Sequence, residues 1–67
     1  MTTEYNDHAM LTTEQVAPLV GMKPGTLMEW RYLQKIGQPP YHKVGRSVRY
    51  RYSEVVQWLA SNMVTSR

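Results

Sequence analysis

The chain has 67 residues, with eight Lys and Arg, five Asp and Glu, and no cysteine. A chain of this length forms one small domain and buries only about 60% of its unfolded surface. Without cysteine, neither a disulfide nor a thiolate metal site can reinforce the core. The sequence contains no apolar run of about 18 residues and no leader with a cleavage site, so we expect a cytoplasmic protein rather than a membrane-spanning or secreted one.

The charge is distributed unevenly along the chain. Residues 1–22 hold three acids and no Lys or Arg, which gives −3, whereas residues 23–67 hold eight basic residues and two acids, which gives +6; the sum is the net charge of +3. Half of the basic residues fall in one short stretch without an acid: Lys43, Arg46, Arg49 and Arg51. Such a local cluster is typical of a surface that binds a polyanion.

The first predicted element follows a polar segment, residues 1–10, which has no periodicity and is predicted to be a flexible N-terminal arm. Thr12 and Gln15 have the spacing of a capping box, and Gly21 suits the left-handed position after a helix. Pro18 lies inside this helix and should kink or shorten it. We expect the folded domain to span residues 11–63, with residues 64–67 frayed.

A second helix is predicted to follow almost at once. Pro24 suits its first position, while Lys23 stands at the N-cap, where it caps poorly. Gly37 is expected to end this helix. Trp30 of this helix and Trp58 near the C-terminus lie on apolar helical faces and are predicted core residues.

Beyond Pro39 and Pro40 the pattern changes to a period of two, which predicts a hairpin with its tip at Gly45, Arg46 and Ser47. Ser53 is the predicted N-cap of a last helix. The sequence therefore predicts a mostly α-helical domain with a small β-hairpin wing, a winged helix-turn-helix.

Catalytic or metal-binding patterns are missing from the sequence. His8 and His42 are isolated, no two carboxylates lie at helical spacing within a predicted helix, and the glycines do not form a phosphate-binding loop. We expect a protein that is not an enzyme and that uses no metal and no cofactor.

The helix-turn-helix beside a basic hairpin indicates a double-stranded DNA-binding protein, with the second helix in the major groove and the wing on the backbone or in the minor groove. The predicted groove residues are Lys23, Gly25, Thr26, Met28, Glu29 and Tyr32. The predicted wing residues are Lys43, Arg46, Ser47, Arg49 and Arg51. The alternative is that the hairpin is a solubilising surface, that Lys23 is a solvated loop residue and that Tyr32 covers the wing.

A second apolar stripe on the last helix offers a candidate protein contact. Its members are Val56, Ala60 and Met63. Such a stripe can equally be ordinary surface.

Several linked motifs together resemble the excisionase (Xis) family, small winged helix-turn-helix proteins related to the MerR DNA-binding domain. The motifs are residues 11–17 (LTTEQVA), 21–22 (GM), 26–27 (TL), 30–32 (WRY), 39–41 (PPY), 43–46 (KVGR), 48–51 (VRYR) and 58–59 (WL). The sequence departs from the family at Lys23, at Pro18 and in a longer segment between Trp30 and Pro39.

This resemblance implies a function in site-specific recombination. It implies that copies bind direct repeats side by side and bend the DNA, acting with an integrase, expected to be a tyrosine recombinase, to favour excision of a phage or mobile element from a bacterial host. We further expect self-association head to tail on DNA, because a lone domain should bind one site weakly, and we expect no membrane and no small-molecule ligand. A small transcriptional regulator of the MerR or AlpA type is the alternative, and a protein–protein adaptor is a further one.

Overall fold

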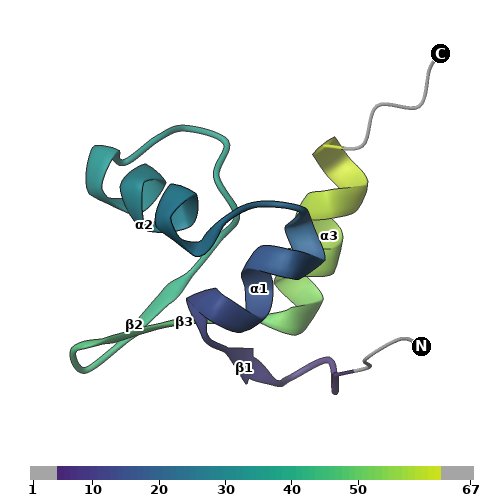
Figure 1. Ribbon diagram of the computed structural model, residues 1–67. Helices are drawn as coiled ribbons and strands as arrows, with labels where there is room; N and C mark the ends of the chain where they lie inside the picture. The colour runs from purple at the N-terminus through teal and green to yellow at the C-terminus, as the bar shows by residue number, and fades with distance from the viewer. Residues whose placement is uncertain (1–4, 63–67) are drawn as a thin grey trace, which may run out of the picture.

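The computed structural model describes residues 5–62. The elements in chain order are β1 (Met10–Leu11), α1 (Thr13–Val20), α2 (Pro24–Leu33), β2 (His42–Val44), β3 (Ser47–Arg51) and α3 (Tyr52–Asn62). The strands form one antiparallel sheet in the order β1-β3-β2, and the β2–β3 hairpin projects away from the helices (Figure 1). The predicted fold class, mostly α-helical with a hairpin wing, is confirmed. The predicted frayed end, residues 64–67, lies outside the described residues.

Helix α1 has the ends that the sequence predicts. The Gln15 amide donates to Thr12 Oγ1 at 3.2 Å, and the Thr12 amide donates to Gln15 Oε1 at 2.9 Å, which completes the capping box. Gly21 has a φ of 71°, a left-handed conformation that few residues other than glycine adopt. Pro18 lies inside this helix and has no N–H to donate to the carbonyl four residues earlier. The helix ends at Val20, two residues after Pro18.

Helix α2 ends earlier than the sequence predicts. We expected Gly37 to terminate it, but the last helical residue is Leu33, and Gln34 follows in the left-handed region with a φ of 53°. Backbone hydrogen bonds close this end, because the Lys35 amide donates to the Trp30 carbonyl at 3.0 Å and the Gln34 amide donates to the Arg31 carbonyl at 3.2 Å. The Gln38 side chain adds to them, since its amide nitrogen donates to the Trp30 carbonyl at 3.2 Å and to the Lys35 carbonyl at 3.1 Å.

The segment before α1 differs from the predicted arm. Residues 5–10 lie against the domain: β1 pairs with β3, and the Tyr5 ring lies 5.5 Å from the ring of Tyr52. The prediction of a flexible arm over residues 1–10 was therefore wrong for residues 5–10, and residues 1–4 lie outside the described residues. The physical reason is that β2 pairs with only one edge of β3, and the backbone groups on the other edge of β3 pair with β1.

The same segment supplies the hydrogen-bond acceptors for the first amides of α3. The Tyr52 amide donates to the Ala9 carbonyl at 2.9 Å, and the Ser53 amide donates to the Asp7 carbonyl at 3.1 Å. The predicted N-cap at Ser53 is wrong, because the helix already begins at Tyr52 and main-chain carbonyls take the place of a side-chain cap.

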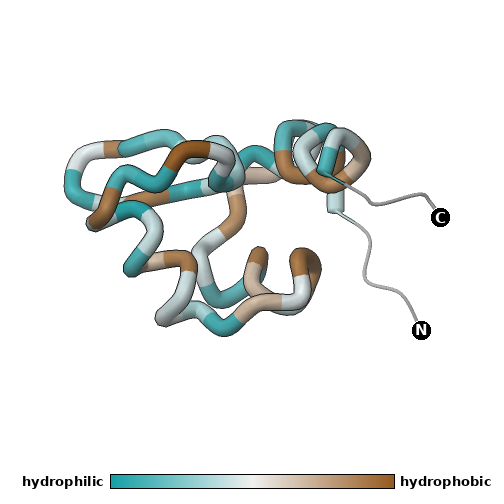
Figure 2. Tube along the Cα trace, turned by 90° about the horizontal axis from the view of Figure 1, so that it is seen from above, coloured by the Kyte–Doolittle hydropathy of each residue, from teal (hydrophilic) through white to brown (hydrophobic). Residues whose placement is uncertain are grey.

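The core is small and lies where α1, α2, α3 and the sheet meet. Its fully buried apolar residues are Leu11, Val16, Ala17, Leu27, Tyr50 and Val55. Hydrophobic and hydrophilic residues are interspersed along the chain (Figure 2). The prediction of Trp30 and Trp58 as core residues is wrong, since both are only half-buried. Trp58 instead donates its Nε1–H to the Gly37 carbonyl at 2.9 Å, which ties α3 to the connection after α2.

Candidate nucleic-acid interface

One face of α2 is open to solvent. Of the predicted groove residues, five are exposed and Thr26 is half-buried; the exposed ones are Lys23, Gly25, Met28, Glu29 and Tyr32. Lys23 makes no capping hydrogen bond, as predicted, and Pro24 takes the first helical position. A Cβ added at Gly25 would meet no atom within 4 Å, so the backbone there is open to a close approach. The exposure of this face permits groove contacts, and the contacts themselves remain predictions.

The wing has two different faces. Lys43 pairs with Val48 and His42 pairs with Arg49 across the hairpin, and residues directly opposite each other share a face. Lys43 and Val48 are therefore on the face that also carries the buried Tyr50; we call this the inner face. Because side chains alternate along a strand, Ser47, Arg49 and Arg51 lie on the other, outer face. The predicted wing cations are thus divided between two faces.

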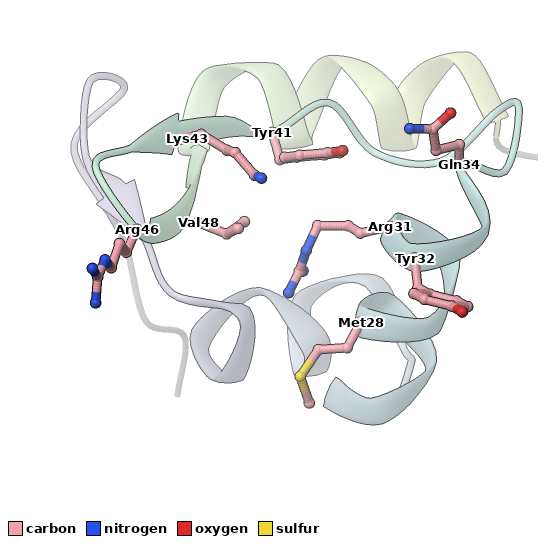
Figure 3. A pocket seen from close by; sticks show the side chains of 8 residues that line it. All are labelled: Met28, Arg31, Tyr32, Gln34, Tyr41, Lys43, Arg46 and Val48. Carbon is pink, nitrogen blue, oxygen red and sulfur yellow. The ribbon is translucent and has the colours of Figure 1, made fainter.

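A hollow of about 380 Å³ separates the inner face of the wing from α2. Its lining residues are Met28, Arg31, Tyr32, Gln34, Tyr41, Lys43, Arg46 and Val48. The ammonium group of Lys43 and the guanidinium group of Arg31 both reach into this space, and Arg46 lies at its outer edge on the turn (Figure 3). Within residues 5–62, none of these three cations forms a salt bridge. The hollow is therefore electropositive.

Arg31 joins α2 to the two elements beside it. Its Nη1 donates to Thr13 Oγ1 at 3.1 Å and to the Tyr50 hydroxyl at 2.7 Å. The guanidinium carbon also lies 5.8 Å from the ring centres of Tyr41 and Tyr50. Sequence reasoning did not identify Arg31 as a site residue. One sequence feature could have identified it: Arg31 is a charged residue on the same side of the helix as Leu27, the one α2 residue that is fully buried.

Carboxylate partners occur on the outer face. His42 Nε2 lies 2.8 Å from Glu54 Oε1, and Arg51 Nε lies 3.8 Å from Glu54 Oε2. Arg49 is half-buried, and its Nη1 donates to the Val48 carbonyl at 2.9 Å. The outer face therefore has its positive charge partly compensated by α3. Contacts of Ser47 and Arg49 with DNA remain predictions, whereas the Glu54 carboxylate beside Arg51 disfavours the predicted DNA contact of Arg51.

The candidate protein-contact stripe is partly described. Val56 is 44% exposed and Ala60 is also exposed, while Met63 lies outside the described residues. More strongly exposed apolar side chains occur elsewhere: Tyr32 is 86% exposed and Ile36, just beyond α2, is 96% exposed. The sequence analysis did not identify Ile36 as a candidate contact residue.

The arrangement is that of a binding surface. Among residues 5–62, no group of three or more histidine or acidic side chains is placed to hold a metal ion. In the same part of the chain, no helix is long and apolar enough to cross a membrane. What the surface offers is a helix face open to solvent, an electropositive hollow and a projecting hairpin.

A family model described as a helix-turn-helix domain matches residues 10–63, which is most of the chain. The match covers α1, α2, the wing and α3. No curated protein and no solved structure is significantly similar to the chain.

Proposed function

This chain belongs to the helix-turn-helix domain family, which indicates that it binds DNA, and we propose that it is an excisionase: a recombination directionality factor of a phage or mobile element. It binds and bends double-stranded DNA at attachment sites. It has no chemistry of its own, and an integrase, expected to be a tyrosine recombinase, cuts and rejoins the strands.

The observation that carries this proposal is the contrast between α2 and the wing. The exposed face of α2 presents Met28 and Glu29 but no arginine or asparagine, the residues that most often read bases. The wing and the hollow beside it are rich in cations that suit phosphate oxygens. A protein that binds mainly through the backbone acquires specificity from the deformability of the DNA. Bending is the expected consequence.

Tandem binding follows from the weakness of a single site. One small domain with little base readout binds a lone site loosely, so adjacent copies on direct repeats must support each other. We propose a head-to-tail contact, which need not close on itself and allows a short filament along DNA. Val56 and Ala60 on α3 are the proposed contact residues, because they are apolar and exposed.

Recombination in vitro tests the proposal. The purified protein is added to the integrase of the same mobile element, with plasmids carrying attL and attR or attP and attB. A coupling of about 1–3 kcal/mol to integrase binding would stimulate excision about 5–150-fold. Integration should be inhibited or unchanged. If both reactions are unaffected while a nearby promoter is repressed, the protein is a transcriptional regulator instead.

Footprinting on direct repeats tests the contact between copies. Val56→Asp should abolish cooperative occupancy and reduce excision while it leaves single-site affinity unchanged. Ile36→Asp is the matched control, because it places the same charge at another exposed apolar position. Independent occupancy of inverted repeats, without bending, would contradict the tandem arrangement.

A further inference from the structure

We infer that Arg31 binds a phosphate of the DNA backbone in the hollow between α2 and the wing, together with Lys43, while it also holds these two elements in position. The inference rests on DNA binding and deepens it by assigning a ligand to a residue that is neither on the exposed face of α2 nor in the wing.

The first step is the bonding of the guanidinium group. Both hydrogens of Nη1 are used, since this atom donates to Thr13 and to Tyr50. Nη2 and Nε make no hydrogen bond within residues 5–62. A guanidinium group has a planar set of donors that matches phosphate oxygens in pairs. Arg31 therefore has one edge committed to the protein and another edge available to a ligand.

The second step is the missing anion. Arg31 is half-buried, yet its partners are two hydroxyl groups and two aromatic rings, all of them neutral. Removing a cation from water without an opposite charge is unfavourable. Lys43 reaches into the same hollow (Figure 3). The Glu54 carboxylate lies beside His42, which is on the outer face of the hairpin with Arg49. Two cations thus face one space that contains no carboxylate.

The third step is the position of the hollow. It lies between the helix that enters the major groove and the wing that contacts the adjacent backbone, so a DNA strand that touches both elements passes its entrance. A volume of about 380 Å³ accommodates a phosphodiester group with its sugar. A phosphate bound there would contact α2 through Arg31 and β2 through Lys43. Arg31 also bonds Tyr50 in β3, which places its guanidinium group between the helix and the wing.

Single-phosphate neutralisation tests the inference. A duplex recovered by in vitro selection is prepared as a series, each member with one methylphosphonate, and affinities are measured by fluorescence anisotropy. At one position, neutralisation should weaken wild-type binding about tenfold or more, as expected for loss of a charged hydrogen bond. The same position should have a smaller effect on Arg31→Met and on Lys43→Met, because one of its two partners is already gone, and less than about a twofold effect on the double variant, which lacks both.

Two control variants separate the roles of Arg31. Lys35→Met removes a cation whose ammonium group lies 5.5 Å from the Trp30 ring rather than in the hollow, and it should keep the full wild-type pattern. Tyr50→Phe removes a partner of Arg31 but leaves its charge, and it should keep the sensitive position. If Arg31→Met is as sensitive as wild type at every phosphate, the inference is wrong, although DNA binding by the wild type stands.

A measurement on the wild type covers the case in which Arg31→Met does not fold. The Arg31 Nε–H resonance should shift when the unmodified duplex binds and should stay near its free position with the methylphosphonate duplex. Sodium phosphate without DNA should not reproduce the shift. A shift that is the same with both duplexes, or that free phosphate saturates, would overturn the assignment to a DNA phosphate.

Discussion

The two faces of the wing should respond differently when an arginine is removed. Arg46 is exposed on the turn, at the edge of the electropositive hollow, and makes no salt bridge within residues 5–62. Arg51 is on the outer face and lies 3.8 Å from Glu54. We therefore expect Arg46→Ala to remove one phosphate contact and Arg51→Ala to remove none.

The magnitude follows from counterion release. With about four to five neutralised phosphates, the slope of log affinity against log salt is about −4, and the affinity of the wild type falls about 250-fold between about 50 and about 200 mM salt. Each lost contact reduces the slope by about 0.9, so Arg46→Ala should lose only about 70-fold over the same range. Arg51→Ala should keep the wild-type slope.

Fluorescence anisotropy with one labelled duplex at several salt concentrations measures these slopes. Both substitutions are outside the core, so each should change the free energy of unfolding, measured by thermal unfolding, by no more than about 0.5 kcal/mol. A flatter slope for Arg51→Ala together with an unchanged slope for Arg46→Ala would mean that DNA lies against the outer face, and the reasoning from the two faces would fail.

Two substitutions in and beside α2 test its surface and its end. Gly25→Ala should raise the free energy of unfolding by up to about 1 kcal/mol, since a Cβ there meets nothing, but weaken duplex binding if the helix backbone approaches DNA closely; a more stable variant with unchanged affinity would place Gly25 away from the DNA. Gln34→Gly should stabilise the protein by about 0.5 kcal/mol in urea unfolding, because it relieves a φ of 53°. A loss of stability would show that the Gln34 side chain makes a larger contribution than the strain.

The parts of the fold that depend on neighbours in sequence were predictable. Thr12 and Gln15 are three residues apart and bond each other, and Gly21 has the conformation that ends a helix. The alternation along the hairpin also predicts that Lys43 and Arg49 lie on opposite faces. In each case, the interacting groups are close enough in the chain for spacing alone to define the geometry.

The parts that depend on distant partners were not predictable. Ala9 and Asp7 accept hydrogen bonds from the first amides of α3, more than 40 residues later in the chain, and nothing in a polar N-terminal segment indicates this. Helical periodicity places Arg31 on the inward side of α2, but it does not reveal that Thr13 and Tyr50 would meet it there. The sequence shows only that a charged residue lies on an inward face of the helix. Identifying the partners of that residue requires the tertiary structure.

The charge of Glu29 constrains how α2 can lie on DNA. Its carboxylate is exposed on the face of α2 that we propose enters the groove, and a phosphate near it would be repelled. In the proposed binding mode, Glu29 points to base edges, where cytosine N4 can donate to it, while the cations of the hollow and the wing tip face the backbone. Such a division would make base recognition narrow and backbone binding dominant. Sites then differ mainly in what it costs to deform them, about 1–6 kcal/mol for a short bent segment. A protein that discriminates in this way acts by stabilising one DNA geometry, which is what a factor that directs an integrase must do.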